Sequence, residues 1–148
     1  MTTKFCTGVD GLFVIDSVVL AAAALRRDTR HRDAIKILSA IGAGRLGKCL
    51  FTDYVLAETL TLIRFSGRGG VEASNKAYEL LLASRNLELV RLNDIELKTA
   101  GEIFKKYPRL SFTDSTTVAL MYARGIKALI SFDTGFDGVP GIERREEV

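Results

Sequence analysis

LFVIDSVVLAAAAL, at residues 12–25, decides the fold. Its first four residues form an unbroken apolar run that predicts a buried strand, and the run stops at Asp16. The Ala- and Leu-rich segment 17–27 predicts a buried helix. A second apolar run, ALISF at 128–132, also stops at an aspartate, Asp133. Parallel sheets bind ligands at the carboxyl ends of their strands, so both aspartates lie where a site is expected.

Segments with helical periodicity separate the apolar runs along the rest of the chain. This alternation predicts an α/β fold with a mostly parallel sheet, in one domain over residues 1–148. The further helices are expected at 34–41, 53–65, 71–85, 94–107 and 113–124, and short strands at 50–51 and 87–92.

Composition narrows the protein class. The chain has 148 residues, of which 47% are hydrophobic and 26% charged, values that are typical of a folded globular domain. No apolar run reaches the roughly 18 residues that a membrane-spanning helix needs. Residues 1–8 show no secretory signal, and two cysteines are too few for a disulfide framework or a zinc site. We therefore expect a soluble cytoplasmic protein. A net charge of +3 does not by itself indicate a nucleic-acid binder.

Three local patterns suggest other functions, but their contexts argue against those functions. Residues 42–48 contain both GxGxxG and GxxxxGK, yet a helix precedes them and a strand follows, the reverse of a phosphate-binding loop. Cys49 stands where such a loop needs a hydroxyl, so we expect a helix end and a turn. Residues 133–135 form the DTG tripeptide of aspartic proteases, but the helical periodicity does not fit their strand-rich folds. His31, among arginines, is expected to face solvent.

Four acids are candidate site residues. Asp16 and Asp133 end strands, although an N-cap or turn role would also explain each of them. Glu58 and Asp114 fall on apolar helix faces, where a carboxylate is costly unless it is compensated. Glu58 could instead reach water from a helix edge, and Asp114 suits the dipole of its helix N-terminus. The apolar neighbours are Val55, Leu62 and Phe65 for Glu58, and Val118 and Met121 for Asp114.

Four carboxylates in one pocket repel one another, and divalent metal ions relieve this repulsion. Ligands that are all oxygen, without His or Cys, favour Mg²⁺ or Mn²⁺. Such ions activate water and stabilise charge during phosphodiester hydrolysis. The acids therefore indicate metal-dependent phosphoryl chemistry.

Three stretches resemble the acidic motifs of PIN-domain nucleases, with the VapC-type toxins of toxin–antitoxin pairs as the nearest likeness: LFVIDSVVLAAAAL, FTDYVLAETLTLI and LSFTDSTTVALMYARGIKALISFDTGF. The resemblance spans about residues 11–142. It assigns catalysis and metal binding to Asp16, Glu58, Asp114 and Asp133. Around them it places the hydroxyl residues Ser17, Ser131 and Thr134, with Asp137 as an auxiliary acid. The sequence departs from the family at Val18, where a polar residue is usual.

The resemblance implies a Rossmann-like three-layer α/β/α sandwich and an endoribonuclease that depends on Mg²⁺ or Mn²⁺. It also implies a homodimer and a cognate antitoxin that inhibits the enzyme. RNA binding requires a basic rim around the acids. The candidates are Arg26, Arg27, Arg30 and Arg32, with Arg64 and Arg68, although an ordinary solvated face would also explain these residues. Without the four acids, 14 acidic residues stand against 21 basic ones, so we expect an acidic centre inside a basic exterior.

Three other functions remain open at this point. The chain could be a PIN nuclease of RNA maturation, or a non-catalytic PIN-like module that binds RNA or protein. A nucleotide-binding protein that uses residues 42–48 is the most remote of the alternatives.

Overall fold

Five parallel strands form the centre of the molecule. The structure is a computed structural model that describes residues 11–148, so the segment 1–8 and Cys6 lie outside the described residues. The strand order is β3-β2-β1-β4-β5 and all four pairings are parallel, which confirms the predicted α/β class. The strands are β1 (Leu12–Ile15), β2 (Lys48–Thr52), β3 (Leu87–Val90), β4 (Ala128–Ile130) and β5 (Glu143–Arg145).

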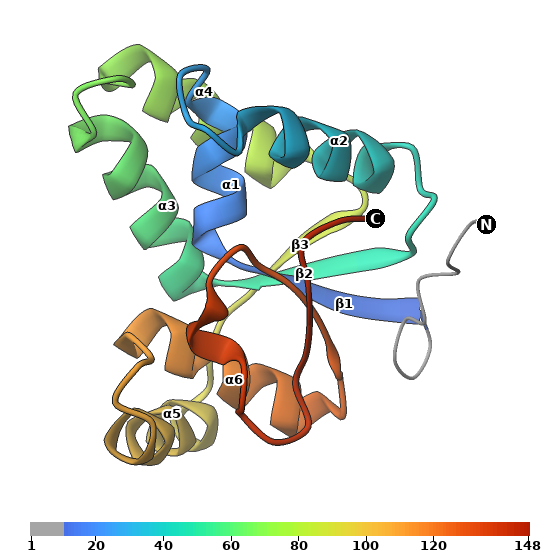
Figure 1. Cartoon of the computed structure of the whole chain (residues 1–148), viewed down its shortest axis with the longest axis vertical. Coiled ribbons are helices and arrows are strands. Elements are labelled where there is room, and N and C mark those ends of the chain that lie inside the picture. The colour runs from blue at the N-terminus through green and yellow to red at the C-terminus, as the bar shows by residue number, and fades with distance from the viewer. Residues whose placement is uncertain (1–10) are drawn as a thin grey trace.

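Helices cover both faces of this sheet, as Figure 1 shows. One layer contains α1 (Ser17–Ala24), α2 (His31–Gly42), α3 (Asp53–Phe65) and α4 (Val71–Ala83). The other contains α5 (Asp94–Lys106) and α6 (Phe112–Arg124), and a short 3₁₀ helix, η2 (Thr134–Phe136), precedes β5. The expected three-layer sandwich is therefore confirmed. No helix within residues 11–148 is long and apolar enough to cross a membrane.

The unbroken apolar run of β1 follows from its central position. Phe13 and Ile15 pack into the core beneath α1–α4, whereas Val14 packs into the core beneath α5 and α6. All three side chains are fully buried. Successive side chains of a strand point to opposite faces, so a strand that is covered on both faces has apolar residues at every position.

Two strands of the sheet, β2 and β5, differ from expectation. Strand β2 is longer than the predicted pair of residues 50–51. Strand β5 was not predicted, because its sequence, ERR, is charged and occupies a partly exposed edge beside β4. The glycine-rich segment 42–48 is the expected helix end and turn. At Gly47 a side chain would collide with the Gly11 carbonyl, which explains the glycine.

His31 differs from the expected solvent-facing residue. It is half-buried at the start of α2, and its Nδ1–H donates a 2.8 Å hydrogen bond to the carbonyl of Ala22 in α1. His31 thereby joins the two helices.

Candidate active site

Two predicted acids meet at the carboxyl edge of the sheet. Asp16 directly follows β1, and Asp133 follows β4, the neighbouring strand. The register pairs Ile15 with Ile130, and the Asp16 N–H donates a 3.1 Å hydrogen bond to the Ile130 carbonyl. The two strand ends are thus fixed side by side, as the sequence predicts.

Asp16 is fully buried and is held from two sides. Its Oδ1 accepts a 2.8 Å hydrogen bond from the backbone N–H of Ser17, which makes Asp16 the N-cap of α1. Its Oδ2 accepts a 2.8 Å hydrogen bond from Ser131 Oγ. Burial, and secondly the charge of Asp114, raise the pKa of Asp16 to about 7, although both hydrogen bonds oppose this rise. The N-cap role therefore coexists with a strongly perturbed carboxyl.

Glu58 reaches the same place from α3. It is half-buried, and its Oε2 accepts a hydrogen bond from Ser17 Oγ. The same hydroxyl lies 3.4 Å from Asp16 Oδ1. Ser17 therefore bridges the acid of β1 and the acid of α3, as expected for a hydroxyl residue beside the site.

Asp114 comes from the first turn of α6. It forms a capping box with Ser111: Asp114 Oδ2 accepts from the Ser111 N–H at 2.9 Å, and Ser111 Oγ accepts from the Asp114 N–H at 3.0 Å. Burial raises the pKa of Asp114 against these hydrogen bonds, and the charges of Asp133 and Glu58 raise it further. The helix-terminus explanation of Asp114 is therefore correct, and the acid still belongs to the cluster.

Asp133 is held in a tight turn after β4. Its own N–H donates to Ser131 Oγ at 3.0 Å, and its Oδ1 accepts a 2.7 Å hydrogen bond from the Gly135 N–H. The next residue, Phe136, is fully buried in the core beneath α5 and α6 and anchors the turn. Thr134 is exposed, and its carbonyl accepts a 3.0 Å hydrogen bond from the Asp137 N–H.

The four predicted acids interact electrostatically. Asp16 is repelled by Asp114 and Glu58, and Asp114 is repelled by Asp133 and Glu58. Within residues 11–148, no Lys, Arg or His side chain forms an ion pair with any of them. Buried carboxylates without a basic partner are compensated best by a cation.

The donor set fits a hard divalent ion, because every available ligand atom is an oxygen. No three His, Cys, Asp or Glu side chains of the described chain surround one ion-sized point as they stand. Coordination by three side chains would therefore require small movements or bridging water molecules, which Mg²⁺ commonly retains.

Buried threonines beneath the site were missed by the sequence reasoning. Thr52 Oγ1 and Thr116 Oγ1 are hydrogen-bonded at 3.2 Å and join the start of α3 to α6. These helices supply Glu58 and Asp114. The TDSTT run at residues 113–117 is the signal that could have indicated this polar contact.

Asp137, the expected auxiliary acid, is exposed and engaged elsewhere. Arg144 donates to both of its oxygens, from Nε to Oδ1 at 2.8 Å and from Nη2 to Oδ2 at 3.0 Å. These bonds lower the pKa of Asp137, so it is an ionised partner of Arg144. Sequence reasoning also missed Arg144, because it lies in the charged tail.

The predicted basic rim divides into two groups. Arg26 and Arg27 are exposed between α1 and α2, and Arg68 Nη1 donates to the Arg27 carbonyl at 3.1 Å. These three arginines line a hollow of about 480 Å³. Arg32 is exposed on α2. Arg30 differs from the expected free cation, because its guanidinium lies 3.9 Å above the Phe132 ring and pairs with Asp33 at 3.0 Å.

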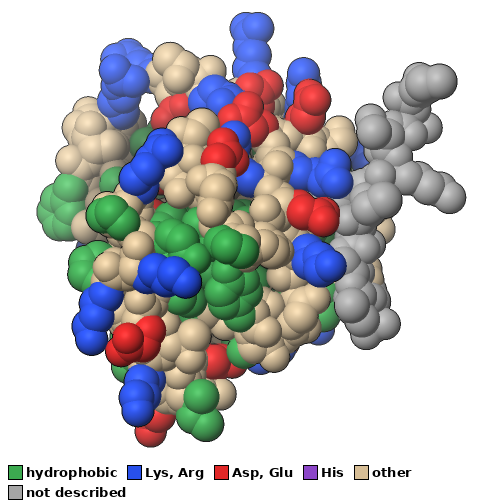
Figure 2. Space-filling view, turned by 60° about the horizontal axis from the view of Figure 1, so that its bottom comes forward, with side chains coloured by type: hydrophobic (Ala, Val, Ile, Leu, Met, Phe, Trp, Pro, Cys, Tyr) green, Lys and Arg blue, Asp and Glu red, His purple; other side chains and the backbone are tan. Residues whose placement is uncertain are grey.

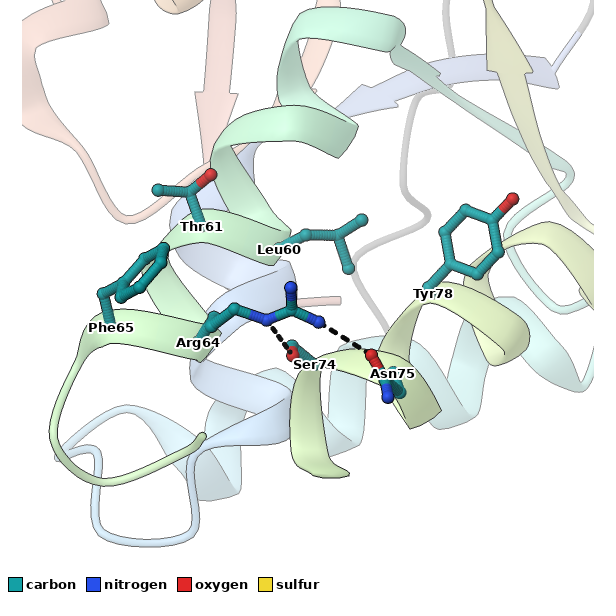
Figure 3. Close-up of a pocket in the computed structure, with 7 residues that line it drawn as sticks. All are labelled: Leu60, Thr61, Arg64, Phe65, Ser74, Asn75 and Tyr78. Atoms are coloured by element: carbon teal, nitrogen blue, oxygen red, sulfur yellow. Dashed lines mark hydrogen bonds between the residues drawn. The ribbon is translucent and has the colours of Figure 1, made fainter. Parts of the chain in front are cut away.

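Arg64 has a role within the fold. It donates from Nε to Ser74 Oγ at 3.0 Å and from Nη2 to Asn75 Oδ1 at 2.7 Å, which joins α3 to α4. Figure 3 shows these bonds in a hollow of about 230 Å³ that Phe65 and Tyr78 flank. On the face that Figure 2 shows, charged side chains of both signs surround a central hydrophobic area.

Comparisons with known proteins agree with this geometry. Residues 13–142 match the family model described as PIN domain. Ribonuclease VapC13 of Mycobacterium tuberculosis is 32% identical over 114 residues, covering 76% of this chain and 82% of that protein. The crystal structure of VapC20 from the same organism, described as a sarcin–ricin loop cleaving toxin, is 25% identical with a TM-score of 0.74, covering 86% and 95%. The structure of VapBC2 from Rickettsia felis, bound to a promoter DNA fragment, shares the fold at 13% identity and a TM-score of 0.66, covering 90% and 97%.

Proposed function

The chain belongs to the PIN-domain family, in its VapC ribonuclease group, and on this premise we propose that it is an endoribonuclease and the toxin of a toxin–antitoxin pair. One observation supports the chemistry above all. Acids from β1, α3, α6 and the turn after β4 gather at one sheet edge, and no basic side chain of the described chain pairs with them. We place the activity in a single domain, residues 1–148, in the cytoplasm.

We propose that Asp16, Glu58, Asp114 and Asp133 hold Mg²⁺ or Mn²⁺. A bound divalent ion would supply an activated water and stabilise charge on the scissile phosphate. The protein contributes the arrangement of the ligands. Ser17 holds Glu58 beside Asp16, and Ser131 orients Asp16 and the backbone of Asp133. These hydroxyls restrict the rotation of the carboxylates, as the outer partners of metal ligands generally do.

The hollow formed by Arg26, Arg27 and Arg68 is the proposed RNA contact, together with Arg32, which is exposed on α2. Three guanidinium groups around one hollow provide several donors for phosphate oxygens. Helix α1 has eight residues between Asp16 and this end, so the hollow lies about 12 Å from the acids at 1.5 Å per residue.

A cognate antitoxin and a second copy of the chain are the proposed protein partners. For the homodimer, the surface around Phe104 on α5 is the candidate, because this aromatic side chain is 47% exposed there. The Phe104 ring also packs edge to face against the ring of Phe112, with 5.8 Å between the ring centroids. Light scattering of the wild type and of Phe104→Glu tests this face. A dimer that persists unchanged in the variant would exclude it.

The decisive experiment compares Asp16→Asn and Asp114→Asn with Asp94→Asn. Asp94 also opens a helix, but it is exposed and lies outside the cluster. Cleavage of an RNA pool should require Mn²⁺ or Mg²⁺, disappear with a chelator and be lost in both cluster variants. Full cleavage by Asp16→Asn and Asp114→Asn would contradict the proposal. If the wild-type protein binds Mn²⁺ but cleaves no RNA, the proposed activity is contradicted and the proposed metal site is still supported.

A further inference from the structure

Arg144, on the edge strand β5, connects several parts of the chain around the acid-bearing turn. Its side chain is only 13% exposed. Besides both oxygens of Asp137, it donates from Nη1 to the Ser131 carbonyl at 3.1 Å and to Glu146 Oε1 at 2.7 Å. We call Arg144 and these three partners the Arg144 clasp. Four directed hydrogen bonds from one planar guanidinium hold this side chain in a single orientation.

The clasp spans the segment that carries Asp133. Ser131 lies at the start of this segment, directly after β4, and Asp137 lies at its end, directly after η2. One guanidinium therefore holds both ends of the turn at once. Because the turn between these points is short, holding both ends restricts where the Asp133 carboxylate can lie.

Ser131 transmits this restraint to the site. The Ser131 carbonyl is bonded to Arg144, while its Oγ donates to Asp16 Oδ2 at 2.8 Å and accepts from the Asp133 N–H at 3.0 Å. One residue thus separates Arg144 from both acids. A shift of Ser131 would move Asp16 and Asp133 relative to each other.

Arg30 is a second basic residue that contacts the same segment, and Glu146 links it to Arg144. Glu146 pairs with Arg144 through Oε1 and lies 3.7 Å from Arg30 Nη2 through Oε2. Arg30 in turn covers the ring of Phe132, between Ser131 and Asp133. The chain Arg144–Glu146–Arg30 therefore brackets the segment from β5 and from the start of α2.

We propose that Arg144 is a positioning residue, which holds Ser131, and through it Asp16 and Asp133, in the arrangement that binds the divalent ion. This inference rests on the proposed metal-dependent function. Arg144 touches none of the four acids and is not a catalytic residue. A lysine could not replace it, because an ammonium group lacks the planar fork that reaches Asp137 in two places and a carbonyl at the same time.

Calorimetric titration of the full-length chain with Mn²⁺ alone tests the inference. Arg144→Met should weaken Mn²⁺ affinity about tenfold or more, the range found when outer partners of metal ligands are removed. Arg144→Lys should give a similar loss. Arg124→Met is the matched control, because it removes an exposed arginine at the far end of α6 and should leave the affinity unchanged. Thermal unfolding of each variant establishes that the titrated protein is folded.

Asp137→Ala keeps the experiment decisive if Arg144→Met does not fold. Asp137 is exposed, so its removal opens no cavity, and it should weaken Mn²⁺ affinity several-fold. The double variant should bind no more weakly than Arg144→Met, because both changes break one clasp. Affinities within twofold of wild type for both single variants, with only a lower Tm, would overturn the inference. Wild-type protein that binds no Mn²⁺ would overturn the metal function as well.

Discussion

Ser131 Oγ donates a 2.8 Å hydrogen bond to Oδ2 of Asp16, joining two residues that are 115 positions apart in the chain. The bond exists because β1 and β4 are neighbours and end at the same edge of the sheet. It is also one of the interactions that lower the pKa of Asp16 against the effect of burial. The ionised form of Asp16 therefore depends partly on a distant serine.

Ser131→Ala should weaken metal binding and destabilise the fold. Two buried or partly buried groups, Asp16 Oδ2 and the Asp133 N–H, lose a partner, which costs about 1–3 kcal/mol each when no replacement exists. The pKa of Asp16 should rise further, so a proton competes better with the metal. Calorimetric Mn²⁺ titrations at pH 7 and pH 8.5 measure this effect, which should be larger at pH 7. Ser39→Ala, at an exposed position of α2, is the control. Equal affinities for Ser131→Ala and wild type would contradict the prediction.

The metal-free protein should lose stability as the pH rises from about 4 to about 7. Asp16 has a pKa of about 7 in the folded chain, against 3.8 for an ordinary aspartate. In this interval the folded state retains a proton that the unfolded state releases, so the free energy of unfolding falls by several kcal/mol as the pH increases. Asp114, whose pKa is also raised, acts in the same direction. Thermal denaturation in a chelator, at a series of pH values, measures the slope.

Asp16→Asn isolates the contribution of this carboxyl. The variant should show a flatter pH profile and, without metal, a higher Tm than wild type at pH 8, because the buried charge is gone. Saturating Mn²⁺ should raise the Tm of wild type and leave that of Asp16→Asn nearly unchanged. A steep profile that persists in Asp16→Asn would assign the pH dependence to another group.

Gly135→Ala should impair the site, whereas Gly101→Ala should not. A Cβ at Gly135 would lie 3.0 Å from Asp133 Oδ1 and 3.1 Å from the Arg109 carbonyl, so the turn must shift and move Asp133. At Gly101, inside α5, a Cβ meets nothing within 4 Å, and alanine should stabilise the helix by about 0.5–1 kcal/mol. RNA cleavage and denaturant unfolding of both variants provide the comparison. Cleavage by Gly135→Ala at the wild-type rate would show that the turn tolerates the methyl group.

Arg26→Ala and Arg27→Ala should weaken RNA binding in a salt-dependent manner. Each phosphate contact removed should lower the slope of log K against log salt by about 0.7 for a single-stranded RNA. Arg30→Ala should behave differently: it should lower the Tm and leave the salt slope nearly unchanged. The reason is that Arg30 packs on Phe132 and pairs with Asp33. Binding to a cleavage-deficient Asp114→Asn background, measured between 50 and 200 mM salt, separates the two effects. Arg124→Ala is the control. If its slope is the same as those of Arg26→Ala and Arg27→Ala, the hollow does not contact RNA.

The central part of the fold and most of the candidate acids were predictable for a common physical reason. A strand that is covered on both faces must be apolar throughout, so an acid directly after it, such as Asp16, stands out in the sequence. Asp114 stands out because a carboxylate on an apolar helix face requires compensation, and its neighbours Val118 and Met121 are fully buried. The same expectation was wrong for Glu58, because Leu62 and Phe65 on its side of α3 are exposed. The grouping of the four acids follows from the resemblance and from the parallel topology. An acid is noticeable in such places because the neighbouring residues of the strand or helix are apolar.

The supporting residues offered no such contrast. Arg144 and Glu146 lie in a charged tail that resembles an ordinary solvated segment, and β5 has no hydrophobic pattern because it lies at a partly exposed edge. The different roles of Arg30 and Arg26 depend on a ring, Phe132, that is distant in sequence. Their effect comes from tertiary geometry, which neither periodicity nor composition encodes.

The position of β1 between β2 and β4 determines when during synthesis the site can exist. Asp16 is made before its partners on β4 and in the turn after it, and the Arg144 clasp comes later still. A chain that terminates before β4 contains Asp16, Glu58 and Asp114 and cannot bring them together with Ser131 or Asp133. The complete cluster of acids therefore arises only after translation has passed β4 and the turn that carries Asp133.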